Sequence, residues 1–220
     1  MIFVNFKSYK EASGDNAVRL AIACETVFEQ TRVQIIPIVQ TIDLWRIKQH
    51  VNIPVWLQHV DEKEAGAFTG HTTAEAAMLS DADGTLLNHS EKPASIEQME
   101  KTITHIKSLD SSFGVMICAP DINVLTAVEK LAPTYISYEP PELIGSKTES
   151  VATAKADVIS AGVEIAKEIP LIVGAGIKSK EDVVAALRKN AKGILVASAV
   201  VTAEHPDEKL HALASAFKSF

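Results

Sequence analysis

Residues 134–145 read Thr134-Tyr135-Ile136-Ser137-Tyr138-Glu139-Pro140-Pro141-Glu142-Leu143-Ile144-Gly145, an apolar run followed by a carboxylate, two prolines and a Leu-Ile-Gly tip. The apolar run is predicted to be a buried strand, so Glu139 stands where that strand ends. Proline fixes its own φ and biases the preceding residue toward extended geometry, so Glu139 should leave the strand on a defined path. A carboxylate, a stiff hinge and a mobile tip together predict a base with its own lid.

Seven other short apolar runs share the character of this strand. They are rich in β-branched residues and nearly continuous in apolar character, which is typical of parallel strands covered on both faces. The predicted strands are Ile2–Phe6, Val33–Ile38, Val55–Gln58, Gly84–Leu87, Gly114–Cys118, Tyr135–Tyr138, Leu171–Val173 and Gly193–Val196. Helix-period stretches follow them at Asp15–Gln30, Ile42–Gln49, Thr73–Leu79, Ser95–Leu109, Asp121–Leu131, Val151–Lys167, Ser179–Lys189 and Asp207–Lys218.

This alternation of strand and helix runs to the C-terminus without a linker rich in Pro, Gly or Ser. It predicts an α/β protein whose residues 1–220 form one domain, a closed (β/α)8 barrel of the TIM type. A doubly wound open sheet is the alternative. No GxGxxG motif follows the first strand, which weakens that alternative.

Composition indicates a soluble globular protein, because 47% of the 220 residues are hydrophobic and 22% are charged. A net charge of -7 argues against binding to nucleic acid. There is no long apolar run and no charged-then-apolar leader, so we expect a cytoplasmic protein that does not cross a membrane. Cys24 and Cys118 lie far apart without a CxxC spacing and are expected to be buried reduced thiols.

Polar side chains gather at the carboxyl ends of three predicted strands. Residues two apart share a face of a strand, and the apolar set Ile2, Val4 and Phe6 should meet the helices. Active sites in barrels of this type are built at the carboxyl ends of the strands. The sets predicted to face inward there are Phe3, Asn5 and Lys7; Thr85, Leu87 and His89; and Tyr135, Ser137 and Glu139.

Two turns at the ends of the last strands predict a phosphate site. Val173-Gly174-Ala175-Gly176-Ile177 ends the seventh strand, and Val196-Ala197-Ser198-Ala199 ends the eighth. The barrel fold commonly binds phosphate with backbone N–H groups of these two loops and a helix N-terminus. Since the chain is acidic overall, such a positive field would be local.

In order along the chain, these pieces resemble the triosephosphate isomerase family, and specifically its shortened archaeal form. The matching motifs are Asn5-Phe6-Lys7, Thr69-Gly70-His71, Leu86-Leu87-Asn88-His89-Ser90-Glu91, Tyr138–Gly145, Gly174-Ala175-Gly176-Ile177 and Ala197-Ser198. The resemblance implies interconversion of dihydroxyacetone phosphate and glyceraldehyde 3-phosphate, a step of glycolysis and gluconeogenesis, with no metal or organic cofactor.

The resemblance also implies a role for each matching residue. Glu139 would be the base, and His89 would be a neutral electrophile that moves protons between the enediolate oxygens. Lys7 would supply positive charge, with Glu91 as the partner that holds its ammonium group. Asn5 would orient the substrate. The implied substrate- and phosphate-binding set is Asn5, Phe6, Lys7, Ile144, Gly145, Gly176, Ala197 and Ser198.

The long loop His59–Thr73 matches the stretch that inserts into a neighbouring subunit in this family. We therefore expect a homodimer or a homotetramer, with Thr69 near the partner subunit's Lys7. Trp45 and Trp56 are interpreted as packing or interface residues.

Three alternatives stay open. Another sugar-phosphate barrel enzyme would need a different acid–base set, and a non-catalytic barrel that binds phosphometabolites would have no use for a base beneath a lid. A metal site is the third, because His59, His71 and His89 lie near the acidic loop Asp61–Glu64. The chain has no HxxxH or HExxH spacing, so isolated loop histidines are the favoured interpretation.

Overall fold

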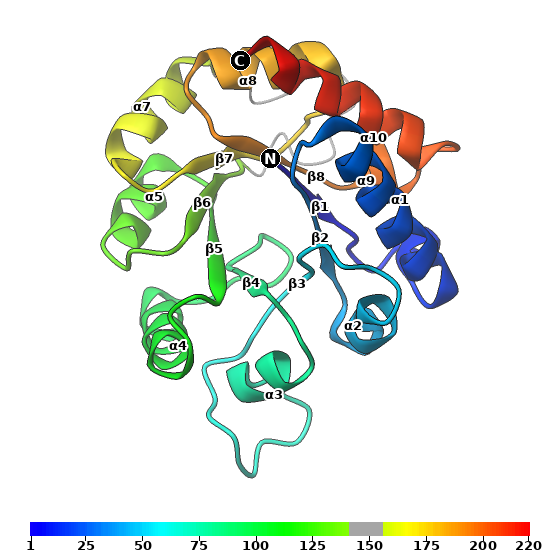
Figure 1. Ribbon diagram of the computed structural model, residues 1–220. Helices are drawn as coiled ribbons and strands as arrows, with labels where there is room; N and C mark the ends of the chain where they lie inside the picture. The colour runs from blue at the N-terminus through cyan, green and yellow to red at the C-terminus, as the bar shows by residue number, and fades with distance from the viewer. Residues whose placement is uncertain (141–155) are drawn as a thin grey trace.

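A computed structural model describes residues 1–140 and 156–220. Eight parallel strands form a closed barrel in which each strand pairs with the next and β8 pairs with β1 (Figure 1). The predicted closed barrel is therefore confirmed, and the open sheet is excluded. The strands are β1 (Ile2–Asn5), β2 (Ile35–Val39), β3 (Trp56–Leu57), β4 (Gly84–Leu87), β5 (Gly114–Ala119), β6 (Tyr135–Tyr138), β7 (Leu171–Val173) and β8 (Gly193–Val196).

Helices surround the barrel, as Figure 1 shows. The predicted helix Val151–Lys167 begins outside the described residues, and its later part is α7. Two short elements have no counterpart in the prediction: η1 (Lys10–Ala12) and α9 (Ser198–Val201). The predicted helix Asp207–Lys218 is divided into α10 (Pro206–Ser215) and the short helix η3 (Ala216–Ser219). The remaining helices are α1 (Asp15–Thr31), α2 (Thr41–Lys48), α3 (Ala74–Leu79), α4 (Ile96–Leu109), α5 (Ile122–Glu129), α7 (Ala156–Ala166), α8 (Lys180–Arg188) and α10 (Pro206–Ser215).

Several helices begin at the residues that local chemistry selects. The Ser95 hydroxyl accepts a hydrogen bond from the Gln98 backbone N–H, and the Gln98 side chain accepts one from the Ser95 N–H. This is the predicted capping box, and it satisfies two donors that a helix N-terminus otherwise leaves unpaired. Ser179 and Asp182 form a second capping box at α8.

The barrel interior is filled by side chains from alternate strand positions. Phe3 meets Trp56 edge-on with ring centroids 5.2 Å apart, and Tyr135 with centroids 5.3 Å apart. Trp56 is a packing residue, as predicted. It occupies the space that a Cβ at Gly84 or Gly114 would need. The interior cluster is Phe3, Ile36, Ile38, Trp56, Leu86, Met116, Cys118, Ile172 and Leu195, with Met1 and Tyr135 packed against it.

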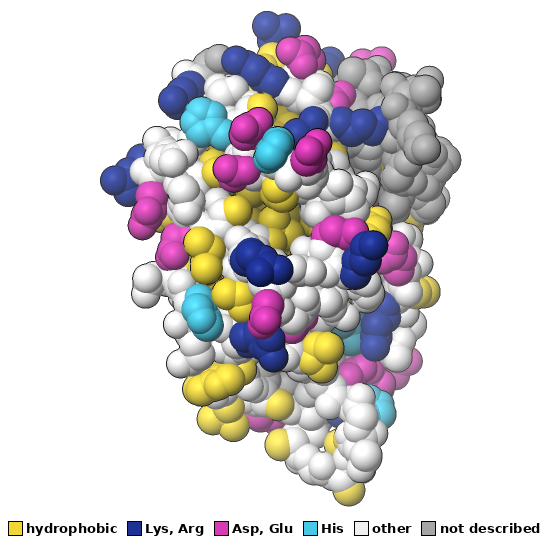
Figure 2. Space-filling model, turned by 90° about the vertical axis from the view of Figure 1, so that its right-hand side faces the viewer, with side chains coloured by type: hydrophobic (Ala, Val, Ile, Leu, Met, Phe, Trp, Pro, Cys, Tyr) yellow, Lys and Arg dark blue, Asp and Glu magenta, His cyan; other side chains and the backbone are white. Residues whose placement is uncertain are grey.

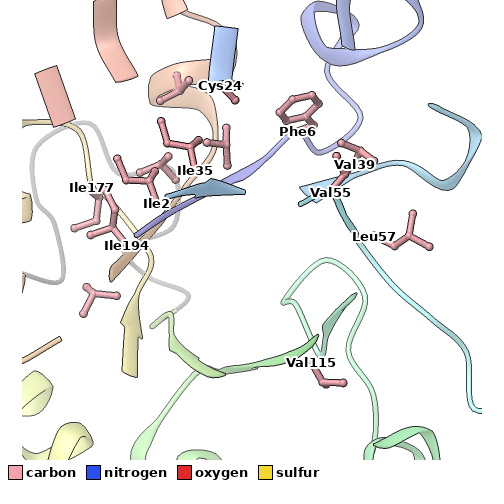
Figure 3. Packing of buried hydrophobic residues seen from close by; sticks show 14 of the residues in the cluster. Ile2, Phe6, Cys24, Ile35, Val39, Val55, Leu57, Val115, Ile177 and Ile194 are labelled. Atoms are coloured by element: carbon pink, nitrogen blue, oxygen red, sulfur yellow. The ribbon is translucent and has the colours of Figure 1, made fainter. Parts of the chain in front are cut away.

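A larger apolar core lies between the barrel and the helices (Figure 3). Ile2, Val4 and Phe6 belong to it, which confirms the predicted outward face of β1. Cys24 of α1 is buried in the same core, and Cys118 is buried inside the barrel; both are free thiols, as predicted. Burial raises the pKa of each thiol.

The predicted inward face of β4 is wrong. Leu86 packs inside the barrel, whereas Leu87 packs in the outer core. His89 nevertheless reaches the carboxyl-end rim because Asn88 has a left-handed backbone, with φ of 57°. That conformation breaks the two-residue alternation, which holds only while the chain stays extended. For β1 and β6 the predicted inward faces agree with the positions of Phe3 and Tyr135.

Candidate active site

One cavity at the carboxyl ends of the strands brings most of the predicted site residues together. Asn5 ends β1, Lys7 and His89 follow β1 and β4, and Glu139 directly follows β6. All four line this cavity, and so do Gly176, Ala197 and Ser198 from the loops after β7 and β8. Widely separated segments therefore meet at the rim where barrels of this type build their sites.

Lys7 is held by hydrogen bonds to its backbone and its side chain. Its φ of 47° lies in the left-handed region, which side chains rarely adopt. The Lys7 N–H donates to Asn5 Oδ1 at 3.0 Å, and Gln58 Nε2 donates to the Lys7 carbonyl at 2.9 Å. Lys7 Nζ lies 2.7 Å from Glu91 Oε1, which is the pairing that the family resemblance implies. The ammonium group is thus directed by a strained backbone and a charged partner.

His89 presents one ring nitrogen to the cavity. Its side chain is buried, and its Nδ1 accepts a hydrogen bond from the Glu91 backbone N–H at 3.2 Å. A backbone N–H can only donate, so Nδ1 must be the unprotonated nitrogen. The ring in this arrangement is neutral and carries its proton on Nε2. That atom lies 3.9 Å from Glu139 Oε2, which is beyond direct hydrogen bonding.

Glu139 is a buried carboxylate with a fixed backbone. It is 6% exposed, and its N–H donates to the Ala119 carbonyl at 2.9 Å. Its Oε1 has no hydrogen-bond partner among residues 1–140 and 156–220. Leaving a buried carboxylate oxygen unpaired is costly, so a purely structural role explains this side chain poorly.

Two neighbours fit closely around Glu139. A Cβ added to Gly174 would lie 2.7 Å from Glu139 Cδ and 3.0 Å from Oε2, so only glycine leaves room for the carboxylate. The Cys118 thiol is the second neighbour. Burial, and then the nearby Glu139 carboxylate, raise the pKa of Cys118. The thiol therefore stays protonated beneath the carboxylate.

Two turns rich in backbone N–H groups form another part of the cavity lining. Ala175 and Gly176 have φ of 68° and 75°, which folds the chain sharply after β7. After β8, Ala197 precedes the short helix α9, whose first N–H groups have no partner within the helix. Groups of this kind bind anions. The loop after β7 also brings Lys178 to the same cavity.

Two described residues of the predicted set, Phe6 and Thr69, lie away from this cavity. The Phe6 side chain is fully buried in the outer core (Figure 3), away from the cavity, and the Phe6 N–H donates to the Ile38 carbonyl at 3.0 Å. Ile144 and Gly145 lie outside the described residues. Thr69 is exposed on the loop between β3 and α3, which projects from the barrel in Figure 1.

Sequence reasoning missed several residues that shape the site. The role of Gly174, which is to leave room for the Glu139 carboxylate, depends on a contact with another strand that the sequence does not display. Gln58 ends its predicted strand as an unremarkable polar residue. Lys178 carried a usable signal, because it directly follows the glycine turn after β7. Tyr9 and Leu195 also line the cavity, together with Ile177, Val196 and Ala199 from the two turns that were predicted to bind phosphate.

The histidines considered for a metal do not converge. His59 Nε2 lies 3.2 Å from Asp61 Oδ1, and Asp61 Oδ2 accepts the Thr72 N–H at 2.7 Å. Burial is the main cause that lowers the pKa of His59. Within the two described ranges, no group of three or more His, Cys, Asp or Glu side chains is arranged to hold a metal ion.

A closed parallel barrel with a buried carboxylate, an imidazole and an ammonium group in one carboxyl-end cavity defines a TIM-barrel enzyme. Residues 1–216 match the model of a family described as triosephosphate isomerase. The chain belongs to the triosephosphate isomerase family.

Curated relatives match nearly the whole chain. A triosephosphate isomerase of Methanocaldococcus jannaschii is 39% identical over 217 residues, which cover 97% of this chain and 98% of the relative. One from Methanothermus fervidus is 38% identical, with 97% and 96% covered. One from Pyrobaculum calidifontis is also 38% identical, with 97% and 94% covered.

Proposed function

We propose that this protein interconverts dihydroxyacetone phosphate and D-glyceraldehyde 3-phosphate through an enediolate. The observation that carries the proposal is the pair Glu139 Oε2 and His89 Nε2, 3.9 Å apart in a cavity that Lys7 also lines. A carboxylate base and a neutral ring donor facing one small space suit proton transfer next to a carbonyl. The family match over residues 1–216 supplies the substrate class.

In the proposed reaction, Glu139 takes a proton from the carbon next to the carbonyl group. The released electron pair forms the carbon–carbon double bond of the enediolate, and negative charge develops on the carbonyl oxygen. His89 donates its Nε2 proton to that oxygen and recovers a proton from the neighbouring hydroxyl group. Glu139 then returns its proton to the second carbon, so that no proton or electron is gained or lost overall.

Lys7 and Asn5 support these steps. The Lys7 ammonium places positive charge where the oxyanion develops, in the cavity lined by the buried His89 and Glu139 side chains. The Asn5 Oδ1 atom is already occupied by the Lys7 N–H, which leaves its NH2 group to donate to the substrate. No metal or organic cofactor is needed for any of these steps.

The phosphate group would bind to backbone N–H groups of Gly176, Ala197 and Ser198. This assignment is supported by the two turns after β7 and β8, which line the cavity. Ile144 and Gly145 complete the proposed set on the family resemblance alone.

Substitution of Glu139 tests the function. Glu139→Asp withdraws the carboxylate by about one methylene and should lower kcat by about 100-fold or more, with KM changed far less. Assays of glyceraldehyde 3-phosphate isomerisation with and without a chelator separate this function from a metal enzyme. A folded wild-type protein that binds the triose phosphates without converting them would be the non-catalytic binding barrel.

We further propose that residues 1–220 fold as one domain and assemble as a homodimer or a homotetramer. Several large apolar side chains on α2 and on the loop before α3 favour self-association: Ile42 is 83% exposed, Trp45 59% and Phe68 41%. In the dimer, Thr69 would lie near the partner subunit's Lys7. Light scattering that gives a monomer mass at micromolar concentration would contradict the assembly, and two separate unfolding transitions would contradict the single domain.

A cytoplasmic location without nucleic-acid or membrane partners fits this function. On the face shown in Figure 2, Lys and Arg side chains are interspersed with Asp and Glu, which gives no continuous positive field for a phosphate backbone. Among the described residues, no helix is both long enough and apolar enough to cross a membrane.

A further inference from the structure

Asn88 occupies the turn that delivers His89 to the cavity. It directly follows β4, and its φ of 57° lies in the left-handed region, which Asn tolerates better than most residues. Without this turn, His89 would continue the alternation of β4 and share the outward face of Leu87, which packs in the outer core. The backbone of Asn88 therefore decides which way His89 points.

The side chain of Asn88 joins two segments that surround His89. Its Nδ2 donates to the Cys118 carbonyl at 2.9 Å, and its Oδ1 accepts the Ala94 N–H at 3.0 Å. The first partner can only accept and the second can only donate, so the orientation of the amide group is fixed. Ala94 immediately precedes Ser95, the N-cap of α4. Asn88 thus closes the loop 88–94 from its first residue to its last.

The backbone N–H and the carboxylate of Glu91 both lie inside this closed loop. The Glu91 N–H donates to His89 Nδ1, and Glu91 Oε1 pairs with Lys7 Nζ. A second backbone hydrogen bond within the loop joins the Lys92 N–H to the His89 carbonyl at 2.8 Å. A change at Asn88 would therefore disturb the group that fixes the His89 tautomer and the partner that holds Lys7.

The same strand also positions Glu139. Cys118 and Ala119 are neighbours on β5; the first carbonyl accepts from Asn88, and the second accepts the Glu139 N–H at 2.9 Å. Two adjacent peptide groups of one buried strand therefore hold the loop of the imidazole and the backbone of the carboxylate. This short connection through β5 keeps the distance between the His89 and Glu139 side chains well defined.

We propose that Asn88 is a positioning residue that sets the place and tautomer of His89 relative to Glu139. The proposal rests on the function proposed above for its effect on catalysis. Its effect on the imidazole is independent of that function.

The test compares Asn88→Gly with Asn190→Gly. Glycine permits the left-handed backbone at both sites but removes the side-chain amide. Asn190 has φ of 66° in the loop before β8, at the opposite end of the strands, so it controls for the general effect of an Asn-to-Gly change. Isomerase kinetics are measured together with the 15N NMR signals of the His89 ring, which report its tautomer.

We expect Asn88→Gly to lower kcat at least about tenfold with KM changed less than about threefold, and to shift the His89 signals from the pure Nε2–H form toward a tautomer mixture. Asn190→Gly should leave both readouts unchanged. Wild-type kcat together with unchanged His89 signals in Asn88→Gly would overturn the proposal, as would equal effects of the two substitutions.

Two further outcomes remain informative. If wild-type protein has no isomerase activity, the proposed function fails, and the His89 signals alone decide the role of Asn88. If Asn88→Gly does not fold, Asn88→Asp replaces it, because a carboxylate keeps the acceptor for Ala94 but replaces the donor to Cys118 with a charged oxygen that faces the Cys118 carbonyl. Unchanged kcat and His89 signals in folded Asn88→Asp would likewise overturn the proposal.

Discussion

Replacing Gly174 with alanine should impair catalysis without unfolding the protein. The new methyl group would lie 2.7 Å from Glu139 Cδ and 3.0 Å from Oε2, so it contacts the proposed base directly. The Gly174 backbone is held by a hydrogen bond from its N–H to the Tyr138 carbonyl at 3.1 Å, which alanine preserves. The side chain of Glu139 therefore has to move.

The size of the effect follows from this geometry. Glu139 Cγ would be the atom nearest to the new methyl group, with Cδ next at 2.7 Å. Two carbon atoms pack comfortably at about 3.5 Å or more, so the Glu139 side chain has to retreat by at least about 0.8 Å. Misplacement of a reacting group by about 1 Å can cost about 100-fold in rate. A 100-fold loss corresponds to about 2.7 kcal/mol of transition-state stabilisation.

Steady-state kinetics in both reaction directions are the assay. We expect kcat to fall about 100-fold and KM to change little, because the displaced group acts on the reacting carbon and does not hold the phosphate. Gly162→Ala is the matched control. Its added Cβ would meet only Leu171 Cδ2 at 3.2 Å and Leu125 Cδ1 at 3.3 Å, in a helix away from the cavity. That variant should keep kcat within about twofold of wild type.

Two results would refute the reasoning. Wild-type kcat in a folded Gly174→Ala protein would mean that the observed position of Glu139 is not the one that chemistry requires. A raised KM with unchanged kcat would assign Glu139 to binding, not to proton transfer. Circular dichroism and thermal unfolding of both variants establish that the comparison is made between folded proteins.

Three other predictions follow from the same structure. Glu91→Gln removes the charged partner of Lys7 Nζ, so we expect kcat/KM to fall by about tenfold or more. The control is Glu97→Gln, which breaks only an exposed pair with Lys101 and should leave kcat/KM unchanged in the same kinetic assay. Gly114→Ala would place a Cβ 2.6 Å from Trp56 Cη2 inside the barrel, and urea unfolding should show a loss of about 1–3 kcal/mol; an unchanged midpoint would contradict the tight interior packing. Burial raises the pKa of both thiols, so the folded state keeps protons that the unfolded state loses above about pH 8.5, and stability should fall as pH rises beyond that value. The slope in urea unfolding should approach about 1.36 kcal/mol per pH unit for each thiol, and Cys24→Ala should reduce it; an identical slope in that variant would refute the assignment.

The strands and helices were predictable because their signals are local. Gly84–Leu87, Tyr135–Tyr138 and Leu171–Val173 match their predicted bounds, since each is a nearly continuous apolar run that ends at a change of composition. The capping box at Ser95 was predictable for the same reason, because its two residues, Ser95 and Gln98, are only three positions apart. Predicted strand ends differ from the observed ones by a residue or two where apolar residues continue beyond the paired part of the strand. Phe6 is an example, because it remains buried beyond the end of β1.

The arrangement around His89 was not predictable in the same way. The two-residue alternation rule placed Leu87 inside the barrel, because this rule assumes an extended chain and Asn88 has a left-handed backbone. That conformation is stabilised by contacts with Cys118 and Ala94, one of them thirty positions away in the chain. Gly174 is comparable, because its lack of a side chain matters only against Glu139 from another strand. Contacts between strands, which a single sequence does not display, decide these details.

The pairing of β1 with β8 has a consequence for how the protein is made. Ile2 lies opposite Ile194, and the Ile194 N–H donates to the Met1 carbonyl at 3.2 Å, so β1 needs as its neighbour the strand of the barrel that is synthesised last. At about 5–20 residues per second, roughly ten seconds or more separate their synthesis. During that interval β1 exposes an unpaired edge that can associate with other chains. Closure of the barrel therefore has to wait until β8 has been made, and messages truncated before β8 should yield nascent chains that depend on chaperones.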